Sequence, residues 1–160
     1  MKIEFTAKRV RLARVAIALV AISLAGYVAY AATQLTISNS GTVVITKNWQ
    51  GITFGPPSSQ PICATQITYS DTPSPIAWGN IAQSGSANGY ICVKNLGGVG
   101  STYSATTSIA PPTGITVTYN GTATLTSGAL AVGQTSIVNV VVSVALTAAT
   151  GGFSYTTSIS

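Results

Sequence analysis

From Thr33 onward the chain alternates apolar and polar residues in short segments, which glycine, proline or asparagine separate about every eight to twelve residues. Valine, isoleucine, threonine, serine and tyrosine dominate these segments, and β-branched and aromatic residues favour strands. No stretch of useful length has helical periodicity. This pattern is typical of an all-β sandwich or barrel.

The first expected strand, 34–46, is long, and Gly41 interrupts it. Asn120-Gly121 is the strongest hairpin signal in the chain, and it predicts that 115–119 turns back into 123–126. We expect the other strands at 52–54, 62–69, 76–81, 89–95, 102–108, 136–146 and 153–159.

The N-terminus has the three parts of a secretory signal: a basic segment, the apolar run 15–30, and small residues around Ala31. We predict that residues 1–31 are a signal peptide cleaved after Ala31, and that the rest is secreted to the cell surface or beyond. The chain would touch the membrane only through this segment, before cleavage. Two alternatives remain: a retained anchor, which normally needs about twenty apolar residues, and a pilin-like leader cut before the run, although Arg14 is not the usual small residue there. Residues 32–46 would then be an N-terminal strand and 47–160 one sandwich domain.

Charge is almost absent after the signal peptide. Residues 32–160 contain only Lys47, Asp71 and Lys94 as charged side chains, and the chain has no histidine. Proton transfer and nucleophilic catalysis need a positioned acid and base, so we expect no enzyme. Metal sites draw on carboxylates, histidine and cysteine, so we expect no metal and no cofactor. Two lysines cannot neutralise a phosphate backbone, so nucleic acid is not an expected partner.

Cys63 and Cys92 are the only cysteines, and an even number in an exported chain predicts a disulfide. The alternative is a pair of buried free thiols. The closed loop would stabilise the fold by about 3 to 4 kcal/mol in the chain-entropy model.

Three further features have a functional and a structural interpretation. Asn120-Gly121-Thr122 is a glycosylation sequon, or simply a turn without a sugar. Asp71 with Lys47 or Lys94 is the one set that an isopeptide crosslink could use. The aromatic side chains are more typical of a core than of a carbohydrate-stacking surface; these are Trp49, Trp78, Tyr69, Tyr90, Tyr103, Tyr119 and Tyr155.

The first strand is the most suggestive element, because cleavage would release it as a free arm. Such an arm can add to an open sheet edge of a second copy, where alternate apolar side chains fill pockets. In this chain those side chains would be Leu35, Ile37, Val43 and Ile45. The alternative is that the strand pairs within its own sandwich. The scarcity of charge favours assembly, because solitary domains usually protect their edge strands with charges.

Three stretches of sequence, IAWGNI (76–81), YICVKNLG (90–97) and LAVGQ (130–134), resemble a group of archaeal secreted immunoglobulin-like β-sandwiches. Some members of that class are similar to subunits of archaeal threads and TasA-like bundling pili. The resemblance implies a filament subunit in which the freed N-terminal strand completes the next subunit, with 33–45 as donor and 136–146 as one wall of the acceptor groove. The expected partners are identical subunits, head to tail, with a glycan on Asn120. The alternative is a secreted surface or adhesive module that does not polymerise.

Overall fold

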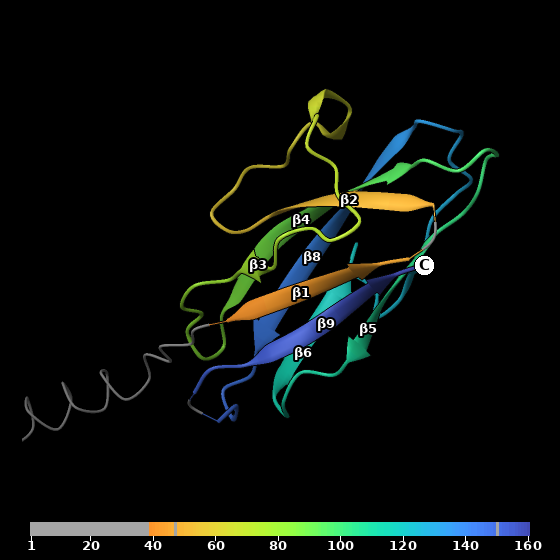
Figure 1. Cartoon of the computed structure of the whole chain (residues 1–160). Coiled ribbons are helices and arrows are strands. Elements are labelled where there is room, and N and C mark those ends of the chain that lie inside the picture. Colours follow the sequence, from red (N-terminus) through yellow and green to blue (C-terminus); the bar gives the residue numbers. More distant parts are fainter. Residues whose placement is uncertain (1–38, 47, 150) are drawn as a thin grey trace, which may run out of the picture. The chain divides into compact units, whose positions relative to one another are not determined.

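A computed structural model describes residues 39–46, 48–149 and 151–160 (Figure 1). The predicted signal peptide, and Leu35 and Ile37 of the predicted arm, lie outside these residues. In the described part the regular structure is nearly all β, with one short 3-10 turn, η1. The elements are β1 (Ser40–Ile45), β2 (Trp49–Phe54), η1 (Cys63–Thr65), β3 (Ile76–Ala77), β4 (Ser86–Asn95), β5 (Ser104–Ile109), β6 (Ile115–Tyr119), β7 (Leu125–Thr126), β8 (Thr135–Val144) and β9 (Ser154–Ile159).

The strands form two sheets. The five-stranded sheet has the order β3-β1-β9-β5-β7, and the four-stranded sheet has the order β2-β4-β8-β6. Apolar side chains from both sheets make one buried cluster, which contains Val43, Tyr155 and Ile159 from the first sheet and Ile91 and Val140 from the second. This arrangement is compatible with a β-sandwich and confirms the all-β prediction.

Period-two alternation explains which side chains enter this core. In β8, Val138, Val140, Val142 and Val144 are buried, while the residues between them are half-buried. Successive side chains in a strand point to opposite faces, so each alternate residue is sorted to the core.

Three expected strands differ from the structure. Of the strand expected at 76–81, only Ile76–Ala77 forms, as β3. Residues 62–69 were expected to form a strand, but this segment contains η1 and irregular backbone that lies over the outer face of β4. The residues after Asn120-Gly121 do turn back, with a bridge between Tyr119 and Thr122. However, β7 then pairs with β5 in the other sheet, not with β6. The turn signal is local, whereas the partner of a returning strand is chosen by where its apolar face can be buried.

Candidate functional site at the first strand

The described part of the predicted arm is β1, and it lies between β9 and β3 of its own chain (Figure 1). Its pairing with β9 is parallel and covers all six residues, from Ser40 opposite Ser154 to Ile45 opposite Ile159. Its pairing with β3 is antiparallel and covers only Ser40 and Gly41. Over residues 42–45, β9 is therefore the one strand partner of β1 in the described part of the chain.

Hydrogen bonds hold both ends of β1. At its start, the buried Asn39 accepts from the Trp78 backbone N–H (3.0 Å) through its carbonyl oxygen and from the Phe153 N–H (3.2 Å) through Oδ1. Asn39 Nδ2 donates to the Gly79 carbonyl oxygen (3.2 Å). At the other end, the backbone N–H of Thr46 donates to the Ile159 carbonyl oxygen (3.0 Å). Sequence reasoning missed Asn39, which marks the point where the arm meets the sandwich.

The side chains of β1 alternate as the arm hypothesis requires. Val43 and Ile45 are buried in the core cluster, while Ser40, Thr42 and Val44 are exposed. Leu35 and Ile37 have the same odd parity in the sequence. Whether the four residues act as a donor stays a prediction, because the described ones pack inside their own chain.

Gly41 is the narrowest point of the β1 site. A β carbon built on Gly41 would lie 2.6 Å from Tyr155 Oη and 3.0 Å from Trp78 Nε1, closer than side chains normally approach. Its backbone is ordinary strand, so glycine is needed here for space and not for an unusual φ angle. Sequence reasoning treated Gly41 as an interruption, although a glycine inside an alternating strand is also the signal for such a close approach.

The two polar atoms that face Gly41 have no hydrogen-bond partner. Trp78 Nε1 and Tyr155 Oη are buried, and they do not meet hydrogen-bond geometry with each other or with any other described group. Burial, reinforced by the nearby Tyr119, raises the pKa of Tyr155 above its usual value, and a contact with the Trp78 N–H that falls short of good hydrogen-bond geometry opposes the rise in part. The space around Gly41 therefore contains two hydrogen-bonding groups without a partner and has no room for a side chain.

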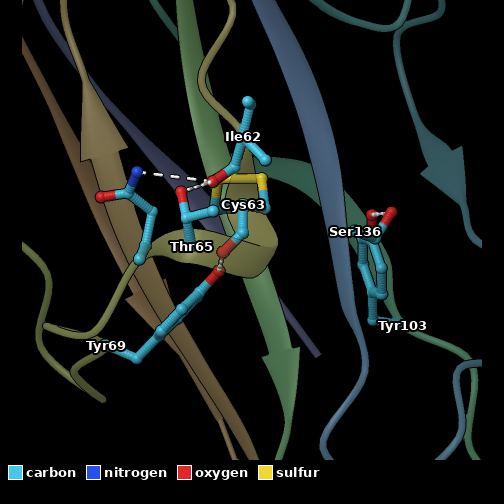
Figure 2. The surroundings of a disulfide bond; sticks show 8 residues. Ile62, Cys63, Thr65, Tyr69, Tyr103 and Ser136 are labelled. Atoms are coloured by element: carbon cyan, nitrogen blue, oxygen red, sulfur yellow. Dashed lines mark hydrogen bonds between the residues drawn. A yellow bond between two sulfur atoms is a disulfide. The ribbon is translucent and has the colours of Figure 1, made fainter.

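The disulfide lies on the outer face of the four-stranded sheet. Cys63 in η1 is bonded to Cys92 of β4, as the sequence predicted. Figure 2 shows Ile62, Cys63 and Thr65 grouped at the bond, with the Tyr69 hydroxyl donating to the Cys63 carbonyl oxygen (2.8 Å). Lys94 Nζ lies 5.5 Å from the centroid of the Tyr69 ring. The bond thus attaches the irregular segment to the face of β4.

Asn120, the predicted glycan acceptor, is exposed at the turn after β6. Its φ of 49° and the 84° of Gly121 are the left-handed values that a two-residue turn requires. Asn120 Oδ1 accepts from the Asn139 N–H (2.7 Å), which ties the turn to β8. The side chain is at the surface, and its glycosylation stays a prediction.

Most of the aromatic side chains belong to the interior, as expected. Trp49, Trp78, Tyr103, Tyr119 and Tyr155 are buried in the core cluster, and Tyr69 and Tyr90 are half-buried. Trp49 packs edge to face on Tyr103, with ring centroids 5.4 Å apart. The core interpretation is therefore confirmed for the five buried rings.

Other features of the described residues offer little chemistry. An open pocket of about 440 Å³ beside β2 is lined by uncharged residues, among them Thr53, Thr68, Ser70, Thr72 and Ser74. Across 39–46, 48–149 and 151–160, no three His, Cys, Asp or Glu side chains gather as a metal site would require. In the same ranges no helix has the length and hydropathy to cross a bilayer.

Comparisons with models of protein families, with curated proteins and with solved structures found no match.

Proposed function

We propose that this protein is a non-catalytic structural subunit of an extracellular archaeal filament, an immunoglobulin-like sandwich whose first strand completes a neighbouring copy. The observation that carries the proposal is the way β1 is held. It pairs over its full length with β9 and over only two residues with β3, and it places Val43 and Ile45 in the core. A strand held in this way can be exchanged between copies while the β4–β8 sheet stays intact.

The unprotected sheet edges also support assembly. The terminal strands of the two sheets are β3, β7, β2 and β6, and none contains a charged residue. Solitary β proteins usually place lysine or other charged residues, or proline, on such edges to prevent association. The chain has three charged residues after residue 31, and none of them lies in these four strands.

The two candidate functions make different demands on the pairing of β1 within its own chain. A non-polymerising surface module needs β1 inside its own sandwich, which is where the described residues lie. A filament subunit needs the same site to be filled by a second copy, so the closed chain would be the form before assembly. The two functions therefore differ in whether the strand exchanges, not in the fold.

The test uses the secreted protein and a substitution upstream of β1. Ile37→Asp should abolish filaments, because an odd-numbered position of an exchanged strand must enter an apolar core and a buried unpaired carboxylate is strongly unfavourable. The matched control is Thr36→Asp, which puts the same charge on the opposite parity and should leave filaments intact. Negative-stain microscopy and size-exclusion chromatography measure both.

Filaments of normal length and yield from the Ile37→Asp protein would refute exchange through this segment. A wild-type protein that stays monomeric at all concentrations would favour the non-polymerising module. The melting temperature of each variant's monomer separates a loss of assembly from a loss of folding.

A further inference from the structure

We infer that β1 reverses its direction when it passes from its own sandwich into a neighbouring copy: parallel to β9 in the closed subunit, antiparallel to β9 in the filament. This inference rests on the proposed function and deepens it, because it assigns an orientation and a register to the exchanged strand. Its basis is the position of the link between β1 and β2.

The exit of β1 and the start of β2 lie at the same end of the sandwich. Thr46 is tied to Ile159 at the end of β9, and the Asn48 carbonyl oxygen accepts from the Leu96 N–H (2.7 Å), just after β4 ends. Trp49, the first residue of β2, is paired with Asn95. Figure 1 shows the C-terminus at this same end. We call it the exit end.

The link is too short to reach along the body. From Ile45 to Trp49 the chain extends by four residues, at most about 14 Å. The ten residues of β4 extend about 33 Å at 3.3 Å per residue. A strand inserted parallel to β9 leaves its acceptor at the exit end, and its own body must then begin within about 14 Å.

Parallel insertion therefore brings two exit ends together. When two exit ends meet, the two copies can exchange their strands reciprocally about a two-fold axis. The resulting dimer has no free acceptor site and cannot grow into a filament. In an end-to-end filament the exit end of one copy meets the opposite end of the next. Only a strand that runs antiparallel to β9 leaves its acceptor at that opposite end.

The direction of the pairing with β9 favours the reversed strand. The β1–β9 pair is the one parallel pair among the described strands, and parallel pairs are slightly less stable per residue than antiparallel pairs. Reversal exchanges the six-residue parallel pairing for an antiparallel one, and it gives up the two antiparallel pairs with β3 and the hydrogen bonds of Asn39 and Thr46 at the ends of β1.

The narrow site at Tyr155 sets the register of the reversed strand. If Gly41 again faces Tyr155, the one glycine of β1 occupies a position where a β carbon has no room. Counting back along the arm then places Asn39 opposite Thr157 and Ile37 opposite Ile159, the positions that Val43 and Ile45 occupy in the closed chain. Val43 would lie opposite Phe153, just before β9 begins. On the outer face, Ser38 would lie opposite Ser158, which is the partner of Val44 in the closed chain.

Two cysteine pairs in the secreted full chain, each with the native disulfide in place, distinguish the two directions. Val44→Cys with Ser158→Cys reports the parallel pairing, and Ser38→Cys with Ser158→Cys reports the antiparallel pairing. Both pairs use Ser158, so they differ only in the position along the arm. Non-reducing gels after mild oxidation compare monomer fractions with pelleted filaments.

We expect the 44/158 pair to crosslink within the monomer, and the oxidised protein to form no filaments until it is reduced. We expect the 38/158 pair to crosslink between chains in filaments, as a ladder that is lost on reduction. A ladder from the 44/158 pair in filaments would overturn the reversal and leave exchange standing. If no polymer forms from the wild-type chain, the proposed function fails, and the inference fails with it.

Discussion

At the scale of single residues, a buried tyrosine hydroxyl forms hydrogen bonds that connect strands of the two sheets. Tyr119 Oη lies 2.9 Å from both Thr107 Oγ1 and Thr157 Oγ1, and so it connects β6 to β5 and β9 across the core. Tyr155 Oη is equally buried but has no partner. Two similar side chains in one core therefore differ in whether their hydroxyl groups are satisfied.

This difference predicts opposite effects for the same substitution. Tyr155→Phe should raise the free energy of unfolding by up to about 1 kcal/mol, because an unpaired buried hydroxyl costs about 1 to 3 kcal/mol. Tyr119→Phe should lower it by about 1 to 3 kcal/mol, because Thr157 would be left buried without its partner. Denaturant unfolding at pH 7 measures both. A loss in Tyr155→Phe as large as that in Tyr119→Phe would show that Tyr155 has a partner after all.

At the scale of elements, β1 shows how a strand's register can be set by one missing side chain. Gly41 is the only residue of β1 that could face Tyr155 and Trp78 without a clash. A slip of two residues would bring Asn39 or Val43 to that position. The site therefore selects one alignment of the arm, whichever copy supplies it.

Gly41→Val should destabilise the monomer by about 1 to 3 kcal/mol or more, the usual range for overpacking a core. Thr42→Val is the matched control, because its side chain is exposed on the opposite face of the same strand and should change stability little. Thermal unfolding followed by circular dichroism compares the two. Equal melting temperatures would mean that Gly41 does not set the register.

Strand positions could largely be predicted, because period-two alternation and turn residues are local signals. The prediction for 115–119 agrees with β6 at both ends, and the disulfide followed from cysteine number and context. The strand expected at 62–69 was wrong because Ile62 and Ile67 resemble strand residues but are exposed on a segment laid over β4. The strand expected at 136–146 is present as β8, but it lies between β4 and β6, and β9, not β8, flanks β1.

At the scale of the whole molecule, the absence of histidine and the single carboxylate after residue 31 leave little to titrate between about pH 3 and pH 9. The alkaline side is different. Burial raises the pKa of Tyr103, Tyr119 and Tyr155. A hydrogen bond to Ser136 opposes the rise in part for Tyr103, and hydrogen bonds to Thr107 and Thr157 do so for Tyr119.

Stability should therefore be flat in acid and fall steeply in alkali. Above about pH 10 the unfolded chain loses tyrosine protons that the fold retains, so each such tyrosine lowers the free energy of unfolding by up to about 1.4 kcal/mol per pH unit. The contribution is complete below pH 10 and is lost as the pH rises toward the raised pKa values. Melting temperatures at pH 3, 7, 9 and 11 test this, and a large drop at pH 3 would contradict it.

The amino-acid sequence by itself determined the secondary structure class, the disulfide and the scarcity of charge, because alternation, cysteine number and composition do not depend on distant contacts. Only the tertiary structure decided that β1 runs parallel to β9, that Gly41 faces Tyr155 and Trp78, and that the link to β2 leaves at the exit end. Strand direction and neighbour choice depend on which distant surfaces can be buried together, and no local pattern records that.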